Sequence, residues 1–93
     1  MSLEVIQIIE ADQDQARTVD QVLRKASFRT NIAFDGPTGI QDIWKNRPAL
    51  VVLDLMAPGI GGKDLCRRLR EDPQTKSIGI ILVTALTSED HRV

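Results

Sequence analysis

The feature that most constrains the fold of this chain is a repeated alternation of short apolar runs with longer amphipathic stretches. Three of the runs, at residues 5–9, 50–53 and 80–83, are almost continuous and rich in Val, Ile and Leu. Such runs are typical of strands that are buried on both faces of a parallel sheet. A fourth run, at residues 30–34, is more mixed, and we expect it to form a strand at the sheet edge.

The stretches between these runs have the spacing of amphipathic helices. Asp12 is placed to cap the first of them, and Gln15 three residues later completes a capping-box pattern. A second helix is expected to begin near Pro37, a third to span residues 63–70, and a fourth to begin at Ser88. The side chains of the second and third helices that we expect to face inward are Ile40, Ile43, Trp44, Leu65 and Leu69.

This alternation predicts a single α/β domain over residues 1–93, with right-handed crossovers between parallel strands. If the second strand is at the edge, the strand order is 2-1-3-4. That order is the flavodoxin-like, doubly wound arrangement, in which ligands bind at the carboxyl ends of the first and third strands.

Composition excludes several classes of protein. The chain has 12 basic and 13 acidic residues, so its charge of −1 does not predict binding to nucleic acid or to an anionic membrane. Its apolar runs are too short to span a bilayer. The lone cysteine, Cys66, cannot form an internal disulfide, which favours a cytoplasmic location.

Oxygen-bearing side chains follow three of the predicted strands. Glu10 and Asp12 follow the first strand, Asp54 ends the third and Thr84 follows the fourth, and no basic residue lies among them. We expect these groups to meet at the carboxyl edge of the sheet, where clustered carboxylates repel each other unless a cation joins them. An oxygen-only site of this kind suits Mg²⁺.

The residues at this edge resemble the motifs of response-regulator receiver domains. Residues 51–62, Val-Val-Leu-Asp-Leu-Met-Ala-Pro-Gly-Ile-Gly-Gly, look like the family's phosphoacceptor segment, and this is the most specific of the matches. Residues 80–85 are similar to its fourth strand, which ends in Thr/Ser-Ala. Residues 8–12 are similar to the acidic end of its first strand, and residues 35–36 to the start of its second helix.

The resemblance implies a role for each matching residue. Asp54 would accept a phosphoryl group from a histidine kinase or phosphotransfer domain and would contribute to catalysis of that step. Glu10, Asp12, Asp54 and the Met56 carbonyl would hold Mg²⁺, Glu10 through water. Thr84 would then bind the phosphoryl oxygens, and the small Ala85 would leave room for them, so that an output surface changes. The family is normally classed as signalling proteins that act on an output domain, not as enzymes.

Two departures from the family pattern are visible. Receivers usually have two adjacent acids after the first strand, whereas Ala11 occupies the second position here and Asp12 comes one place later. The resemblance also stops before the fifth strand and helix, which include a characteristic Lys. We therefore expect an open edge at residues 80–83, through which the chain forms homodimers or aggregates.

Two other functions remain open from the sequence. A pseudo-receiver would keep the fold as a protein-interaction module with little phosphoryl chemistry, and Ala11 favours this alternative. An aspartate-based phosphatase would need a second Asp two positions after the first, where this chain has Met56.

Overall fold

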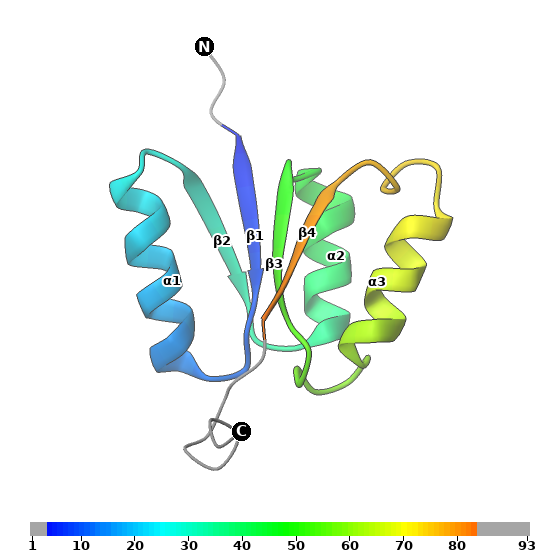
Figure 1. Ribbon diagram of the computed structural model, residues 1–93, viewed down its shortest axis with the longest axis horizontal. Coiled ribbons are helices and arrows are strands. Elements are labelled where there is room, and N and C mark those ends of the chain that lie inside the picture. The colour runs from blue at the N-terminus through cyan, green and yellow to red at the C-terminus, as the bar shows by residue number, and fades with distance from the viewer. Residues whose placement is uncertain (1–3, 84–93) are drawn as a thin grey trace, which may run out of the picture.

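A computed structural model of the chain describes residues 4–83 (Figure 1). Strands and helices alternate in the order β1 (Val5–Ile9), α1 (Gln13–Lys25), β2 (Arg29–Ala33), α2 (Gly36–Asn46), β3 (Leu50–Asp54), α3 (Gly62–Glu71) and β4 (Gly79–Val83). The strands are parallel and lie in the order β2-β1-β3-β4. The predicted fold class, strand order and edge position of β2 are confirmed. The helix expected from Ser88 lies outside the described residues.

Aspartate side chains begin the first two helices. The Asp12 carboxylate accepts a hydrogen bond from the Gln15 N–H at 2.9 Å, and Asp35 accepts one from the Thr38 N–H at 2.7 Å. Each bond satisfies a backbone donor that the first turn of a helix leaves unpaired. The predicted cap at Asp12 is confirmed, but the other half of the capping box differs. The Asp12 N–H donates to Glu10 Oε2 at 3.2 Å and not to the Gln15 side chain.

The main apolar core lies between the sheet and the helices α2 and α3. Ile9, Ile43, Leu53 and Leu65 have no exposed surface there, so strands β1 and β3 and both helices contribute to one cluster. Helix α2 approaches β1 closely at Gly39, where an added Cβ atom would lie 2.4 Å from Ile9 Cδ1. Any larger residue at this position would require the Ile9 side chain or the helix to shift.

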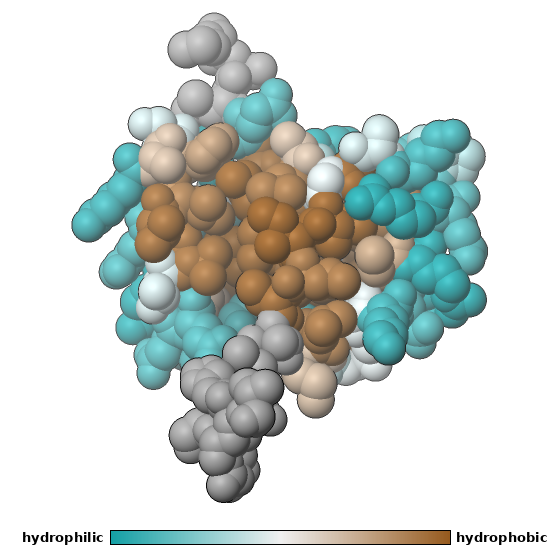
Figure 2. All heavy atoms as spheres, in the orientation of Figure 1, coloured by the Kyte–Doolittle hydropathy of each residue, from teal (hydrophilic) through white to brown (hydrophobic). Residues whose placement is uncertain are grey.

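The opposite face of the sheet is covered less completely. Helix α1 packs against β1 and β2, and it buries Ala16 beside the inward side chains of those strands. Figure 2 shows apolar side chains gathered over the middle of this view, with hydrophilic residues around them. In β4, Ile81 and Val83 are 49% and 40% exposed on this face, and Leu82, which pairs with Leu53 on the other face, is 45% exposed. Strand β4 is at the end of the strand order and has β3 as its one neighbour in the part of the chain that the structure describes, so the open edge expected from the sequence is present there.

The connection between α3 and β4 is held by hydrogen bonds to backbone carbonyls. Arg70 Nη1 donates to the carbonyls of Lys76 and Ile78 at 2.7 and 2.6 Å. The fully buried Thr75 hydroxyl donates to the Leu69 carbonyl at 2.7 Å. These bonds join the end of α3 to the start of β4.

Trp44 does not lie beneath the sheet, as its helical spacing predicts, but at the surface. Its side chain is 37% exposed, and the Arg47 guanidinium lies 4.7 Å from the ring centroid. Ile43, one position earlier, takes the fully buried place. The large indole is placed where α2 ends, beyond the part of the helix that faces the core.

Candidate functional site

The site begins with two carboxylates on adjacent strands. Ile9 of β1 pairs with Leu53 of β3, so Glu10, which follows β1, and Asp54, the last residue of β3, lie side by side at the carboxyl edge. Both are buried, with exposed fractions of 7% and 5%. The predicted meeting of these two side chains is confirmed.

Burial of two acids side by side changes the chemistry of Glu10. Loss of hydration raises the pKa of Glu10, and the neighbouring Asp54 carboxyl raises it further as a hydrogen-bonding partner and as a like charge. The backbone N–H of Asp12 acts in the opposite direction and lowers this pKa. Burial is thus the main reason that ionised Glu10 is disfavoured, and the like charge of Asp54 adds to it, so a cation beside the two acids would favour the ionised form.

Backbone donors fix the orientation of both carboxylates. The Met56 N–H donates to Asp54 Oδ1 at 2.9 Å, and the Asp12 N–H donates to Glu10 Oε2. Reasoning from residue types missed these two contacts. A signal for the first was available, because an Asp at a strand end commonly accepts a hydrogen bond from the backbone two residues later.

The structure places the Asp12 side chain at the start of α1 and not, as the sequence predicts, beside the two buried acids. Its side chain caps α1 and is exposed to solvent. Within residues 4–83, no group of three or more His, Cys, Asp and Glu side chains is arranged to hold a metal ion. Of the three predicted carboxylates, Glu10 and Asp54 lie side by side, whereas Asp12 caps α1 through Oδ1 and acts on Glu10, in addition to burial, as a nearby like charge that raises its pKa. Thr84 and Ala85 lie outside the described residues.

The loop between β3 and α3 forms one side of the site. Gly59 adopts a φ of +91°, which an L-residue with a side chain rarely accepts, and it lies against the ring of Pro37. Met56 is 74% exposed beside this turn. A hollow of about 480 Å³ adjoins it, lined by Leu55, Met56, Gly61, Gly62, Lys63 and Asp64. Lys63 is the basic residue that lines this hollow.

Comparison with known proteins places this geometry in a family. The family model of the response regulator receiver domain matches residues 6–93. This chain belongs to the response-regulator receiver domains. The structural motifs that carry the resemblance, a buried Asp54 at the end of β3 and the turn that follows it, are those expected of the family.

Individual relatives agree with this assignment. The receiver domain is 31% identical over 88 residues to the response regulator PleD of Caulobacter vibrioides, a match covering 95% of this chain and 19% of PleD. The N-terminal domain of a response regulator receiver protein from Methanoculleus marisnigri has a TM-score of 0.84 at 27% identity, covering 96% of this chain and 74% of that one. The BeF₃-activated receiver domain of RstA from Klebsiella pneumoniae has a TM-score of 0.79 at 32% identity, with coverages of 91% and 70%.

The receiver domain thus spans about a fifth of its curated relative PleD. Receiver domains are generally signalling modules without enzymatic activity of their own. In residues 4–83, no helix combines the length and apolar character needed to cross a membrane.

The donor atoms of the receiver's acidic pair fit Mg²⁺, which receiver domains bind in general. Mg²⁺ prefers oxygen ligands, keeps several waters and is commonly bound by one or two carboxylates together with phosphate oxygens. Glu10 and Asp54 supply two carboxylates that lie side by side, and a positive charge beside them would offset the burial and like charge that raise the pKa of Glu10. The exposed bend at Ala11 leaves the usual position of a third acid without a carboxylate.

Proposed function

We propose that this receiver domain accepts a phosphoryl group on Asp54. The observation that carries the proposal is that Asp54 is buried at a strand end beside a second acid, with only one of its oxygens held by a backbone donor. Oδ1 accepts the hydrogen bond from the Met56 N–H, so Oδ2 is the oxygen that we assign to attack. A carboxylate fixed in this way needs little reorganisation before it reacts.

The transfer joins Asp54 Oδ2 to phosphorus and breaks the bond between phosphorus and the histidine nitrogen of the donor. The Met56 N–H donates to Oδ1 and so holds the carboxylate with Oδ2 available for the attack. Thr84, at the position of the family's conserved hydroxyl, would then bind the new phosphoryl oxygens, and Ala85 would leave space for them. These changes would shift the equilibrium between two conformations of the output surface.

We assign Glu10, Asp54 and the Met56 carbonyl as the residues that hold Mg²⁺, with Asp12 as a further contributor through solvent. The ion supplies positive charge that balances the two acids and the phosphoryl oxygens. Glu10 is oriented toward this place by the Asp12 N–H. Asp12 itself remains able to cap α1, since its Oδ1 is bonded to the Gln15 N–H.

The partners follow from this chemistry. The donor is a histidine kinase or phosphotransfer domain, and the recipient of the signal is an output domain. The domain is not an enzyme with its own substrate turnover, and we assign it to the cytoplasm, where the thiol of Cys66 would stay reduced. The near-neutral charge gives it no direct role in binding nucleic acid or membranes.

The proposal is tested by incubation with Mg²⁺ and acetyl phosphate, followed by measurement of the intact mass. A single phosphoryl adduct is expected for the parent and for the control Asp14→Asn, which changes an exposed acid in the first turn of α1. Asp54→Asn should abolish the adduct while the circular dichroism spectrum is kept. No adduct on the parent would instead support a pseudo-receiver, and repeated turnover of acetyl phosphate would support a hydrolase.

A second test concerns Ala11. Because divalent-ion affinity rises with the number of charged ligands, Ala11→Asp should tighten Mg²⁺ binding several-fold in a calorimetric titration. Ala49→Asp adds the same charge in an exposed position before β3, at the opposite edge of the sheet, and should leave the affinity unchanged. Equal affinities for the parent and Ala11→Asp would mean that Asp12 already supplies the missing ligand.

A further inference from the structure

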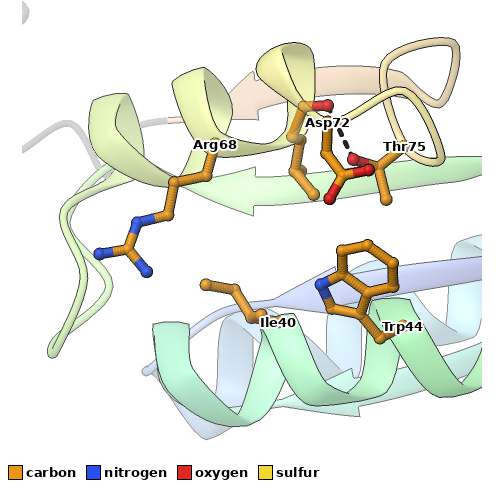
Figure 3. Close-up of a pocket in the computed structure, with 6 residues that line it drawn as sticks. Ile40, Trp44, Arg68, Asp72 and Thr75 are labelled. Carbon is orange, nitrogen blue, oxygen red and sulfur yellow. Dashed lines mark hydrogen bonds between the residues drawn. The ribbon is translucent and has the colours of Figure 1, made fainter.

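A second concave site lies between α2 and α3, away from the acidic pair. It is a pocket of about 200 Å³ lined by Ile40, Trp44, Arg68, Leu69, Asp72 and Thr75 (Figure 3). Both helices begin at the carboxyl edge of the sheet and run toward the other edge, and Trp44 and Asp72 come at their far ends. The pocket is therefore separate from the phosphoacceptor site.

The pocket combines an apolar wall with opposite charges. Figure 3 shows the Asp72 carboxylate over the Trp44 ring, while the Arg68 side chain extends toward the other end, beyond Ile40. Its size is below that of sites for whole cofactors, which usually exceed about 300 Å³, and it suits a single side chain. Leu69 is 3% exposed and continues the apolar wall from α3.

The polar side chains at and near the rim of the pocket differ in whether they already have hydrogen-bond or ion-pair partners. Among residues 4–83, Arg67 pairs with Asp64, and Arg70 bonds to backbone carbonyls, whereas Arg68 has no hydrogen-bond or ion-pair partner. Asp72 Oδ1 accepts the Gln74 N–H at 2.8 Å, which leaves its other oxygen as an acceptor.

The aromatic wall is also held in place before any ligand arrives. Arg47 lies over the Trp44 ring, and its Nη2 donates to Gln74 Oε1 at 2.6 Å, so the end of α2 is joined to the loop after α3. A side chain fixed in this way loses little conformational freedom when a ligand binds. Trp and Arg are also the residue types that most often dominate binding energy in protein interfaces.

We propose that this pocket binds a protein segment in which an aromatic side chain lies next to an acidic one. The aromatic ring packs on Trp44 and Ile40, the acidic group pairs with Arg68, and a backbone N–H of the segment donates to the second oxygen of Asp72. Each group of the ligand then meets a complementary group of the pocket. The proposal does not depend on phosphorylation of Asp54.

Trp44 provides a direct measurement, because the chain has one Trp and no Tyr. The probe is a dipeptide of phenylalanine and aspartate with an acetylated amino end and an amidated carboxyl end. Its matched control contains asparagine in place of aspartate and differs only in charge. Titration should change the Trp44 fluorescence saturably, with a dissociation constant on the order of 1 mM for so small a ligand. The asparagine dipeptide should bind about fivefold more weakly.

Variants of α3 locate the site. Arg68→Gln should weaken binding of the aspartate dipeptide about fivefold and remove its advantage over the asparagine dipeptide. Arg67→Gln, one residue earlier on the same helix, is the control and should change the dissociation constant less than twofold. The proposal is wrong if the fluorescence does not saturate, if both dipeptides bind equally to the parent, or if Arg67→Gln weakens binding as much as Arg68→Gln.

Discussion

Strands β3 and β4 are adjacent, parallel and similar in sequence, yet they occupy very different environments. Leu53 of β3 pairs with Leu82 of β4, and their exposed fractions are 0% and 45%. Val52 and Ile81, the preceding pair, are 8% and 49% exposed. Helices and a strand on each side enclose β3, whereas β4 has one neighbouring strand among the described residues. Apolar runs of equal length therefore contribute unequally to stability, and the difference depends on position in the sheet.

The largest expected effect comes from shortening the same side chain in both strands. Leu53→Ala should lower the free energy of unfolding by about 2–5 kcal/mol, because it leaves a cavity among fully buried neighbours. Leu82→Ala should lower it by about 1 kcal/mol or less, since nearly half of that side chain is already in water. Urea denaturation measures both. Equal losses would show that the two strands are buried alike in solution.

The next effect concerns association through the edge of β4. The strand contains no charged residue, and its outer edge, which pairs with no strand among residues 4–83, is a template for another strand. We expect the 93-residue chain to associate at micromolar concentration, and Ile81→Lys to shift it toward the monomer in light scattering. Val22→Lys, which places the same charge at a 62% exposed position of α1, is the control and should leave association unchanged. A monomeric parent with a cooperative thermal transition would contradict the open-edge interpretation.

The smallest effect is at the ends of the two strands, where Asp54 of β3 pairs with Val83 of β4. Burial of Glu10, and then the neighbouring Asp54 carboxyl at the end of β3, raise the pKa of Glu10 above its ordinary value of 4.5, so the folded state binds that proton more tightly than the unfolded state does. Stability from this source is complete below pH 4.5 and is lost as the pH rises through the folded-state pKa.

Glu10→Gln removes this titration. The variant should be more stable than the parent at pH 7 without Mg²⁺, and the advantage should disappear as the pH falls below 4.5. Urea denaturation across this pH range gives the comparison, and Glu71→Gln, an exposed acid at the end of α3, controls for the loss of one charge. An advantage that does not change with pH would mean that burial of Glu10 is not its cause.

The sequence predicts the strand order and the acidic pair because both depend on short apolar runs and on the residues that directly follow them. An apolar run that ends in Asp54, beside one that ends before Glu10, is sufficient to place two acids at one edge of a parallel sheet. The role of Asp12 was harder to predict, since the same carboxylate can cap a helix or face a metal, and hydrogen-bond geometry decides between them. The prediction for Trp44 is wrong because helical spacing cannot show that the end of α2 extends beyond the part of the helix that faces the core.

The exposure of β4 was foreseen only as a consequence of the family resemblance. Its residues, Gly-Ile-Ile-Leu-Val, have the composition of a buried central strand, and nothing in them distinguishes the strand from β3. The α2–α3 pocket could not be predicted at all, because its walls come from positions 24 to 35 residues apart whose side chains meet only after the helices pack.

Arg70 has a consequence for the alignment of β4 with β3. Side chains on both faces of β4 are apolar, so hydropathy alone would tolerate a slip of one residue, although such a slip exchanges the two faces. The Arg70 guanidinium donates hydrogen bonds to the carbonyls of Lys76 and Ile78. These bonds fix the path of the chain between α3 and the first residue pair of the two strands, Leu50 with Gly79. A basic side chain on a helix thus fixes the register of a neighbouring strand. It selects one of the two registers that the hydropathy of the strand's own residues would permit.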